Sequence, residues 1–364
     1  MKELTTFFDQ KLPKQVEKLR NLETNISPDA MPETSDETYK ELNSVLYQVV
    51  KDCGELDTAL RGDDELLKET RSRFQKEFTP WLVKGWFGQR VVEKPRGYAG
   101  DYRTLIAIYD IDVKQPGYGG YVDRWMLQLM LSRAIRSRWQ EMRKFLTKEL
   151  SARSGEVSVL DIASGPAREF SKPLELTSDC NVTLQCLDND PESLDFVRDN
   201  VVAASGIKDF RLDRYNALRL KSSKNTIRAY GKFDIVYSIG LFDYIDDTRL
   251  VQILSGVKDL VNEDGVIYLN FKDTKEYNEI EYQWLLDWHF FQRTEQDCLD
   301  LFAQAGYDMK CMEPTTRDET GVIINFVNRV SGADIRVDLG TKDVPRPKLS
   351  EAQTRAETKD SEGI

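Results

Sequence analysis

The sequence is poor in the residues that build disulfide frameworks, zinc sites and membrane spans. Its 5 cysteines are scattered along 364 residues, and no two of them have the C-x-x-C spacing of a zinc or redox site. A reducing compartment is the simplest environment for such a chain, so we expect a cytoplasmic protein. No run of about 18 apolar residues occurs, so no integral membrane contact is expected.

The sequence also lacks an excess of basic residues. The chain has 51 Lys and Arg residues against 62 Asp and Glu residues, a formal net charge of −11. Proteins that track nucleic acid usually present a basic face, so no nucleic-acid partner is expected. The N-terminal stretch Met1–Arg20 is charged throughout and lacks the apolar core of a secretory signal. We interpret it as a packing helix, with an amphipathic membrane-surface helix as the alternative. The oligomeric state stays open.

The length allows two domains. Residues 1–150 carry apolar side chains at helical spacing, which predicts a mostly helical N-terminal region that we interpret as a substrate cap. Within it, a Gly/Tyr loop at Gln115–Tyr121 is expected to lead into one long helix, Val122–Leu150. Residues 332–364 are polar and charged, which is typical of a disordered tail.

Residues 156–330 alternate short β-branched runs with helical stretches. This pattern is typical of an α/β fold with a parallel sheet. The last two predicted strands have no clear helix between them and are expected to form a hairpin at the sheet edge. The predicted strands are Ser158–Ile162, Val182–Leu187, Phe210–Asp213, Phe233–Ser238, Val266–Phe271, Tyr307–Met312 and Val322–Arg329.

The loop after the first of these strands carries the first functional signal. The stretch VSVLDIASGPAREF, Val157–Phe170, ends its apolar run at Asp161 and continues with small residues. Ligands of open α/β sheets bind beyond the carboxyl ends of the strands, so this loop is placed to hold one. The second predicted strand ends near Asp188, whose carboxylate can accept both hydroxyls of a ribose.

Dinucleotide-binding domains share these parts, but the chemistry of their loop differs. NAD binding uses G-x-G-x-x-G and a helix N-terminus that holds a pyrophosphate. Here Asp161 is followed by Ala163, Gly165 and Ala167 at intervals of two. An acid at the loop entrance repels a phosphate and attracts a cation, so the indicated ligand carries a ribose and a positive charge. The alternative is that Asp161 and Asp188 are ordinary helix-capping acids.

The motifs VLDIASGPA, LDNDPESL, RYNAL, FDIVYSIGLFDYIDD and LVNEDGVIYLNF, in this order, resemble those of class I S-adenosylmethionine-dependent methyltransferases. The resemblance covers residues 156–330. It implies a Rossmann-like seven-stranded sheet with a C-terminal hairpin strand pair, and S-adenosyl-L-methionine as the cofactor. The chain departs from the family at Ala163 and Ala167, where relatives have glycine. Alanine at positive φ is costly and can weaken cofactor binding.

Carried over position by position, the resemblance also implies the cofactor contacts. The residues near the methionine end and the sulfonium would be Asp161, Ala163, Ser164, Gly165 and Ala167. The remaining implied contacts are Asp188 at the ribose, Asn189, Asn216 and Ala217 at the adenine, and Ser238, Gly240 and Leu241 as a wall on the methionine side.

The loop after the fourth predicted strand, SIGLFDYIDD, restricts the acceptor. It lacks the Asn/Asp-Pro-Pro-aromatic sequence of relatives that methylate base amines, and no cysteine lies near Ser238 to act as a C5 nucleophile. Catechol-type relatives hold magnesium at a position that corresponds to about Ile239, so no metal is implied. A small-molecule acceptor remains, methylated on oxygen or nitrogen.

The glycine- and aromatic-rich segment KPRGYAGDYRTLIAIYD precedes the sheet region. We interpret it as a lid over the acceptor, and the alternative is a helix-connecting loop that is packed by its tyrosines. The candidate lid residues are Arg96, Tyr98, Asp101 and Tyr102, with Tyr118 and Tyr121.

This segment, with LDIASGPAREF and IGLFDYIDD, more loosely resembles a bacterial group that makes 3-hydroxypalmitic acid methyl ester, a quorum signal. That resemblance implies a fatty-acid carboxylate acceptor, which needs no base because it is already a nucleophile. The aromatic side chains that would line an acyl channel, or that are simply core, are Trp284, Trp288, Phe290 and Phe291.

A hydroxyl acceptor would need a base, and the only histidine is His289. It lies in LLDWHFFQRT, which we interpret as an apolar helix, so His289 is either packed or catalytic. Arg293 follows one turn later. It either pairs with a substrate carboxylate or with Asp287 or Glu295.

The favoured function is therefore a metal-independent methyltransferase of small molecules. A methyltransferase-like ligand-binding or regulatory module without turnover is one alternative, and the two alanines of the loop keep it open. An aminopropyl transferase is another, although no paired-aspartate polyamine loop is found.

Overall fold

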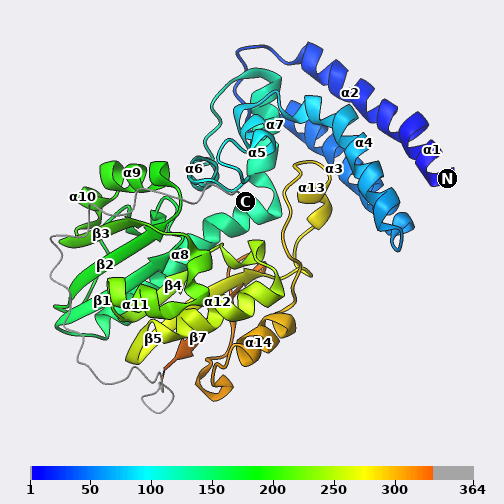
Figure 1. Cartoon of the computed structure of the whole chain (residues 1–364). Coiled ribbons are helices and arrows are strands. Elements are labelled where there is room, and N and C mark those ends of the chain that lie inside the picture. The colour runs from blue at the N-terminus through cyan, green and yellow to red at the C-terminus, as the bar shows by residue number, and fades with distance from the viewer. Residues whose placement is uncertain (1, 331–364) are drawn as a thin grey trace, which may run out of the picture. The chain divides into compact units, whose positions relative to one another are not determined.

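The computed structural model describes residues 2–330 and divides into two compact units. Unit 1 comprises residues 1–138, 273–292 and 319–322, and unit 2 comprises the rest of the chain. Figure 1 follows the chain through its elements. The predicted tail, 332–364, lies outside the described residues.

Unit 1 is built from helices. They are α1 (Lys2–Thr6), the π-helical turn η1 (Phe7–Lys11), α2 (Leu12–Asn25), α3 (Glu37–Leu60), α4 (Asp64–Leu82), α5 (Trp86–Glu93), α6 (Tyr102–Asp110), α7 (Gly117–Gln128) and α13 (Glu279–Gln283). The N-terminal stretch packs through Phe7, Phe8 and Leu19, which are all buried. This agrees with the interpretation of that stretch as a packing helix.

The Gly/Tyr stretch before the sheet is helical, so the predicted loop at Gln115–Tyr121 is wrong. α7 begins at Gly117, and the chain leaves the helical conformation at Leu129 (ψ 151°) before the next helix. The single helix predicted over Val122–Leu150 is therefore two helices. A Cβ at Gly119 or Gly120 would clash with neighbouring backbone carbonyl oxygens, so these glycines allow close packing rather than a turn.

Unit 2 contains one seven-stranded sheet in the order β3-β2-β1-β4-β5-β7-β6. The first five strands pair in parallel, and β7 is antiparallel to both β5 and β6. This confirms the predicted α/β, Rossmann-like architecture with its edge hairpin. The strands are β1 (Glu156–Ile162), β2 (Asn181–Asp188), β3 (Asp209–Arg214), β4 (Phe233–Ser238), β5 (Val261–Lys272), β6 (Thr316–Arg317) and β7 (Ile323–Arg329).

The strand predicted at Tyr307–Met312 is wrong. Those residues form a loop with the short 3₁₀ turn η5 (Met309–Cys311), and the edge strand is β6. The Asp308 side chain accepts from the N–H of Lys310 at 2.9 Å, which starts the turn. Tyr307 lies in the core rather than in a strand: it is 5% exposed, and its hydroxyl donates to the carbonyl oxygen of Leu254 at 2.9 Å.

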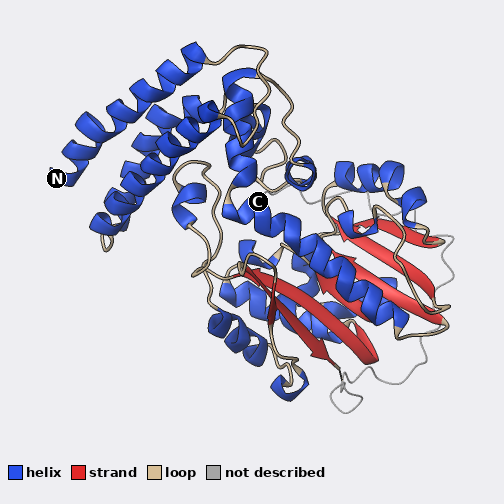
Figure 2. Ribbon diagram, turned by 180° about the vertical axis from the view of Figure 1, so that it is seen from behind, coloured by secondary structure: helices blue, strands red, loops and turns tan. Residues whose placement is uncertain are grey.

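Helices cover both faces of the sheet (Figure 1, Figure 2). On one face, α8 (Met130–Ser151) and α9 (Pro191–Asn200) bury apolar side chains against β1, β2 and β4. On the other, α12 (Asp247–Asp259) and α14 (Glu295–Gln304) pack on β4, β5 and β7. The remaining elements of the unit are η2 (Arg168–Phe170), α10 (Val202–Ser205), η3 (Ala217–Lys221), α11 (Ser223–Tyr230) and η4 (Phe242–Tyr244).

Within residues 2–330, no helix is long and apolar enough to cross a membrane. In the same residues, no group of three or more His, Cys, Asp and Glu side chains is arranged to hold a metal ion. All five cysteines are described, and none of them forms a disulfide.

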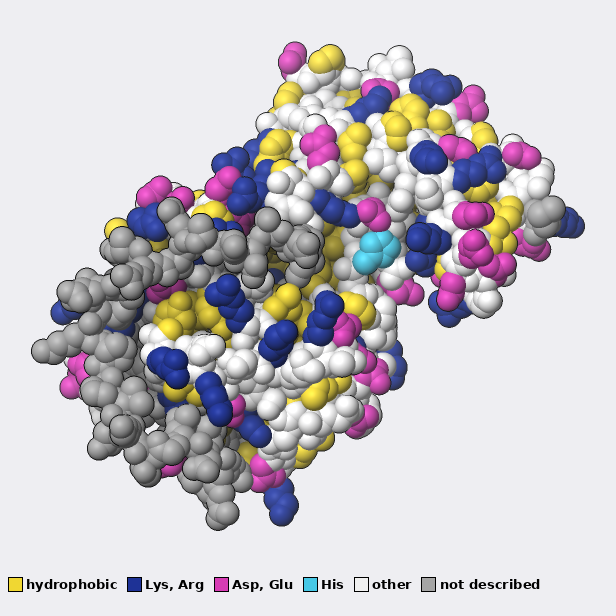
Figure 3. Space-filling view, in the orientation of Figure 1, with side chains coloured by type: hydrophobic (Ala, Val, Ile, Leu, Met, Phe, Trp, Pro, Cys, Tyr) yellow, Lys and Arg dark blue, Asp and Glu magenta, His cyan; other side chains and the backbone are white. Residues whose placement is uncertain are grey.

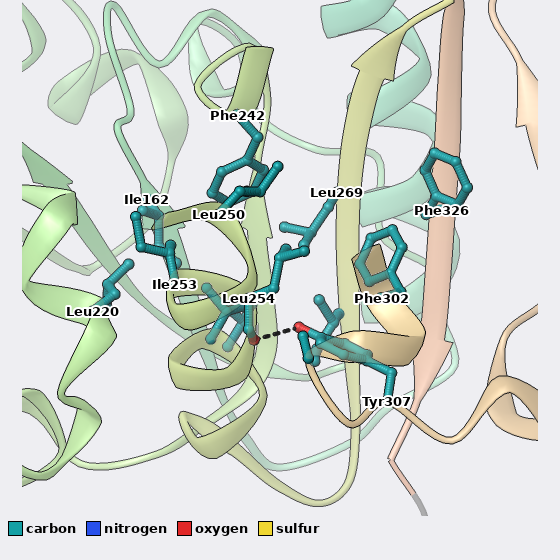
Figure 4. Packing of buried hydrophobic residues seen from close by; sticks show 14 of the residues in the cluster. Ile162, Leu220, Phe242, Leu250, Ile253, Leu254, Leu269, Phe302, Tyr307 and Phe326 are labelled. Atoms are coloured by element: carbon teal, nitrogen blue, oxygen red, sulfur yellow. Dashed lines mark hydrogen bonds between the residues drawn. The ribbon is translucent and has the colours of Figure 1, made fainter. Parts of the chain in front are cut away.

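The packing of α14 against the sheet can be tested at Phe302. Phe302 of α14 is 1% exposed, and its ring lies 5.2 Å from that of Phe326 and 5.0 Å from that of Tyr307 (Figure 4). Truncation at this position leaves a cavity between the helix and the sheet. We expect Phe302→Ala to lower the free energy of unfolding by about 3–5 kcal/mol. Urea denaturation measures this change, with exposed Gln304→Ala on the same helix as a control that stays within about 0.5 kcal/mol.

Candidate cofactor site

The loop after β1 lies at the point where the strand order reverses. β1 pairs with β2 on one side and with β4 on the other, and such switch points bind ligands in open α/β sheets. Three alternating residues of the loop have left-handed backbone conformations: Ala163 (φ 56°), Gly165 (φ 53°) and Ala167 (φ 44°). Only glycine adopts this conformation freely, so the two alanines carry strain. Such strain often marks a functional loop.

Asp188 at the end of β2 holds this loop in place. Its Oδ2 accepts from the N–H of Gly165 at 2.8 Å, and its Oδ1 accepts from the N–H of Asp190 at 2.8 Å. A carboxylate has about four acceptor sites, so two remain for the hydroxyls of a ribose. Burial raises the pKa of Asp188, and the N–H donors from Asp190 and Gly165 oppose that shift.

Helix α9 is capped by Asp190 and not by Asp188. The Asp190 side chain accepts from the N–H of Glu192 at 3.0 Å. The oxygens of Asp188 instead accept from the backbone N–H groups of Gly165 and Asp190. Asp161 lies inside β1 and caps no helix. The capping alternative for these two acids therefore finds no support in the geometry.

Asp161 places a buried carboxyl group next to the loop after β1. It is 1% exposed, its Oδ1 has no hydrogen-bond partner among the described residues, and its Oδ2 lies 4.0 Å from the Cys186 thiol. Burial and the neighbouring charge of Glu169 raise its pKa well above the ordinary value. The Oγ of Ser164 is likewise buried without a partner among the described residues. These two orphaned atoms fit the donors of a ligand with an ammonium group, such as the methionine end of S-adenosylmethionine.

The other predicted cofactor residues lie at the same edge of the sheet. Asn216 caps η3 and accepts from the N–H of Leu218 at 2.9 Å, with Ala217 next to it. Asn189 is exposed after β2, and Leu241 is half-buried. The last two predicted residues, Ser238 and Gly240, make contacts that hold the loop after β4.

Two hydrogen bonds brace that loop. The Ser238 hydroxyl donates to the carbonyl oxygen of Ile162 at 2.7 Å, which joins the ends of β4 and β1. The N–H of Gly240 (φ 92°) donates to Oδ1 of Asn270 at 3.2 Å. Sequence reasoning missed Asn270, because an asparagine inside a buried strand gives no sign of which loop it contacts.

Arg293 is buried in unit 2, and its partner is not one that the sequence suggested. Its guanidinium contacts the Asp247 carboxylate at 2.7 Å and donates to the carbonyl oxygens of Phe242 and Ile245 at 3.1 and 2.5 Å. At 2% exposed, it positions η4 and the start of α12. This is a scaffold for the loop after β4.

His289 belongs to unit 1 and is neither helical nor packed. Residues 287–292 form no helix, so the prediction of an apolar helix around His289 is wrong, and its side chain is 54% exposed (Figure 3). Its Nε2 lies 2.8 Å from Oδ1 of Asp287, and Lys94 donates to Oδ2 of the same carboxylate at 2.6 Å. The hydrogen bond from His289 and the ammonium of Lys94 lower the pKa of Asp287 to about 2.

The candidate lid residues all belong to unit 1, in two different settings. Asp101 is fully buried, caps α6 and pairs with Arg90 at 2.8 Å, and Tyr102 behind it is buried. Tyr98 is 40% exposed, and Arg96 is half-buried.

The tyrosines of α7 are packed. Tyr118 and Tyr121 are both buried, and the Tyr121 hydroxyl donates to Asp36 at 2.9 Å. This agrees with the alternative of a region packed by its tyrosines for these two residues.

The aromatic segment of unit 1 is mostly core. Trp284 is fully buried, its Nε1–H donates to Asp57 at 2.8 Å, and its ring lies 5.5 Å from that of Phe74. Trp288 and Phe290 are buried and contact each other at 5.5 Å, whereas Phe291 is 47% exposed.

Comparison with known proteins identifies the fold. No family model and no curated protein matches the sequence. A possible exported protein from Bordetella parapertussis shares the fold, with a TM-score of 0.54 and 16% identity over 82% of this chain and 99% of that chain. Weaker similarities include magnesium protoporphyrin IX methyltransferase from Synechocystis, with S-adenosylmethionine bound (TM-score 0.40, 14% identity, 55% of this chain, 84% of that one). Another is the N-methyltransferase NodS from Bradyrhizobium japonicum (TM-score 0.35, 11% identity, 53% and 97%).

The sheet order and the loop geometry define a Rossmann-like fold of the class I methyltransferase type. At 16% identity, the likeness to the Bordetella protein supports a shared fold and carries no statement about activity.

The strain in the loop predicts an unusual response to glycine. Left-handed alanine costs about 1–2 kcal/mol, whereas glycine costs about 0.5–1 kcal/mol in extra chain entropy. We therefore expect Ala163→Gly to leave the free energy of unfolding unchanged or raised by up to about 1.5 kcal/mol. The matched control, Ala303→Gly in helix α14, should lower it by about 0.5–1 kcal/mol. Equal losses in the two variants, measured by urea denaturation, would show that the alanine is not strained.

Proposed function

We propose that the protein is an S-adenosylmethionine-dependent methyltransferase that acts on a small-molecule acceptor without a metal ion. The observation that carries this proposal is a pair of buried carboxylates on neighbouring parallel strands, Asp161 near the end of β1 and Asp188 at the end of β2, on either side of a left-handed loop. A phosphate-bearing ligand would be repelled by this arrangement, and a cationic nucleoside would be attracted.

S-adenosylmethionine, when bound, supplies a methyl group activated by a sulfonium. The residues of this chain bind and orient. Asp188 accepts ribose hydroxyls with its remaining lone pairs, and Asp161 faces the ammonium end. Ser238 and Gly240 fix the loop after β4 through the contacts to Ile162 and Asn270 described above. Positioning and exclusion of water can supply much of the rate of an in-line methyl transfer.

For the acceptor we propose a fatty-acid-type carboxylate, with a hydroxyl as the second option. A carboxylate needs no base, which agrees with the looser sequence resemblance to the quorum-signal group. A hydroxyl needs a base, and His289 with its Asp287 partner is the candidate in unit 1. Unit 1 also holds Arg96 and Tyr98, which we propose as acceptor-binding residues. Asp101 and Tyr102 are buried and are not proposed for this role. We further propose a cytoplasmic location.

One observation favours a second candidate, a ligand-binding module without turnover. The strained alanines at Ala163 and Ala167 replace the glycines of relatives, and they can reduce cofactor affinity. The two functions differ in whether the bound nucleoside is consumed.

Cofactor binding tests the site directly. We expect the wild-type protein to bind S-adenosylmethionine in titration calorimetry and Asp188→Ala to raise the dissociation constant at least about 10-fold, because two ribose contacts are lost. Asp195→Ala, an exposed acid on α9, is the matched control and should leave the dissociation constant unchanged. A wild-type protein that ignores S-adenosylmethionine and binds NAD tightly would refute the proposed function.

Turnover separates the enzyme from the binding module. We expect the wild-type protein to form S-adenosylhomocysteine when a 3-hydroxylated long-chain fatty acid is present, and not with the methyl ester of the same acid, whose carboxylate is blocked. Mass spectrometry of the lipid product identifies which oxygen carries the methyl group. Binding of S-adenosylmethionine without S-adenosylhomocysteine formation for any acceptor class would favour the binding module. Methylthioadenosine release with decarboxylated S-adenosylmethionine and a polyamine acceptor would favour an aminopropyl transferase.

A further inference from the structure

The end of β5 holds the loop after β4 at two points. Oδ1 of Asn270 accepts from the N–H of Gly240 at 3.2 Å, and the ammonium of Lys272 contacts Oδ2 of Asp243 at 2.6 Å. The N–H of Lys272 also donates to Oδ1 of Asp243 at 3.1 Å. Side chains two residues apart on a strand lie on the same face, so Asn270 and Lys272 reach the loop from one face of β5. We refer to Lys272 and Asp243 as the buried ion pair, because their side chains are 4% and 2% exposed.

The turn that carries Asp243, η4, is also joined to the residues before it. The N–H of Tyr244 donates to the carbonyl oxygen of Leu241 at 3.1 Å. The ring of Phe242 lies in the core (Figure 4) and stacks on that of Phe271 at 5.8 Å, on the other face of β5. A movement of η4 is therefore passed to the first residues of the loop.

The buried ion pair is better suited to fixing a geometry than to adding stability. Two charges lose their hydration when they are buried, and this loss offsets most of their attraction. Apolar residues can therefore often replace such a pair without loss of stability. The two bonds to Asp243 define where its carboxylate lies, because one comes from the side chain and the other from the backbone of Lys272.

The strand order places this loop beside the ammonium end of the proposed ligand. The strands run β2-β1-β4-β5, so Asp188, Asp161 and the loop after β4 follow one another along the edge of the sheet. Asp161 is paired in register with Tyr237 of β4, and the Ser238 hydroxyl donates to the carbonyl oxygen of Ile162 at 2.7 Å. A nucleoside with its ribose at Asp188 and its ammonium at Asp161 therefore has its amino acid end toward β4.

We propose that Lys272 and Asp243 are positioning residues for the methionine end of S-adenosylmethionine and act through Gly240 and Leu241. The buried ion pair sets the position of η4, and η4 sets the position of the wall that this loop presents to the ligand. The ribose at Asp188 lies two strands away and does not depend on the pair. The inference rests on the proposed function, because it needs a nucleoside that carries an amino acid group.

The experiment compares two ligands. Methylthioadenosine has the adenine, ribose and sulfur of S-adenosylmethionine but lacks the ammonium and the carboxylate. Asp243→Asn keeps an acceptor for the N–H of Lys272 and removes the carboxylate charge. We expect it to raise the dissociation constant of S-adenosylmethionine at least about 10-fold in titration calorimetry, because the wall at the amino acid end is displaced, and to change that of methylthioadenosine less than about 2-fold. Equal increases for the two ligands, or none for S-adenosylmethionine, overturn the inference.

A double variant separates positioning from stability. Asp243→Asn takes a carboxylate away from the buried ammonium of Lys272, so we expect it to lower the midpoint of urea denaturation. Combining it with Lys272→Met also removes the buried charge and should restore the midpoint, while the affinity for S-adenosylmethionine stays weak. An affinity that recovers together with the midpoint would show that the pair acts on stability alone, against the inference.

Glu149→Gln is the matched control, since it also converts the carboxylate of a buried ion pair into an amide. Glu149 is 5% exposed and contacts Arg329 at 2.6 Å. Arg329 lies opposite Val266, roughly 20 Å along β5 from Lys272. We expect this variant to leave both dissociation constants unchanged.

Hydrogen exchange of the wild type needs no variant and no second ligand. We expect bound S-adenosylmethionine to slow the exchange of backbone amides in residues 239–246, because the ligand contacts the wall that the pair positions. A loop whose exchange does not respond to the bound ligand overturns the inference and leaves the proposed function intact, so misfolding of the variants does not remove the test. Failure of the wild type to bind S-adenosylmethionine refutes the proposed function instead.

Discussion

The hydrogen bond from the N–H of Gly165 to the carboxylate of Asp188 is the contact on which the site depends. It ties the loop after β1 to the end of β2, and it does so at the place where the strand order of the sheet reverses. Because the two backbone N–H donors occupy only part of the acceptor sites of Asp188, the same carboxylate can also accept hydrogen bonds from a ligand. The loop geometry and the ligand-binding acid are therefore one structural unit.

The loop also shows how strain and burial are combined at one site. Ala163 and Ala167 take conformations that suit glycine, and Asp161 and Glu169 place two carboxyls in an apolar layer. Each feature costs folding free energy, and each persists because the strands and η2 around it fix its position. A cationic ligand at Asp161 would relieve the electrostatic part of this cost, which is the physical reason for proposing a sulfonium nucleoside with an ammonium end.

Unit 1 has a different balance of features. Most of the aromatic residues discussed above are packed inside it: the ring of Trp284 contacts that of Phe74, and the buried Tyr121 donates to Asp36. Its exposed polar residues include the His289 and Asp287 pair and Tyr98. The acceptor chemistry that we propose for this unit therefore depends on a small number of side chains.

The sequence by itself determined the five parallel strands and β7, but not the edge strand β6. Short β-branched runs predict β1 to β5 and β7, because strands that are buried on both faces need apolar runs. The acids Asp161 and Asp188, near or at the ends of two such runs, could be picked out as ligand-binding candidates from the sequence alone. The sequence could not reveal that Tyr307 is core, that Gly117–Tyr121 is helical or that His289 is exposed, since each depends on neighbours far along the chain. Only the tertiary structure shows that the Tyr237 hydroxyl donates to Glu169 and that Asn270 accepts from the N–H of Gly240 in the loop after β4. Side-chain contacts between neighbouring elements depend on register and not on local pattern.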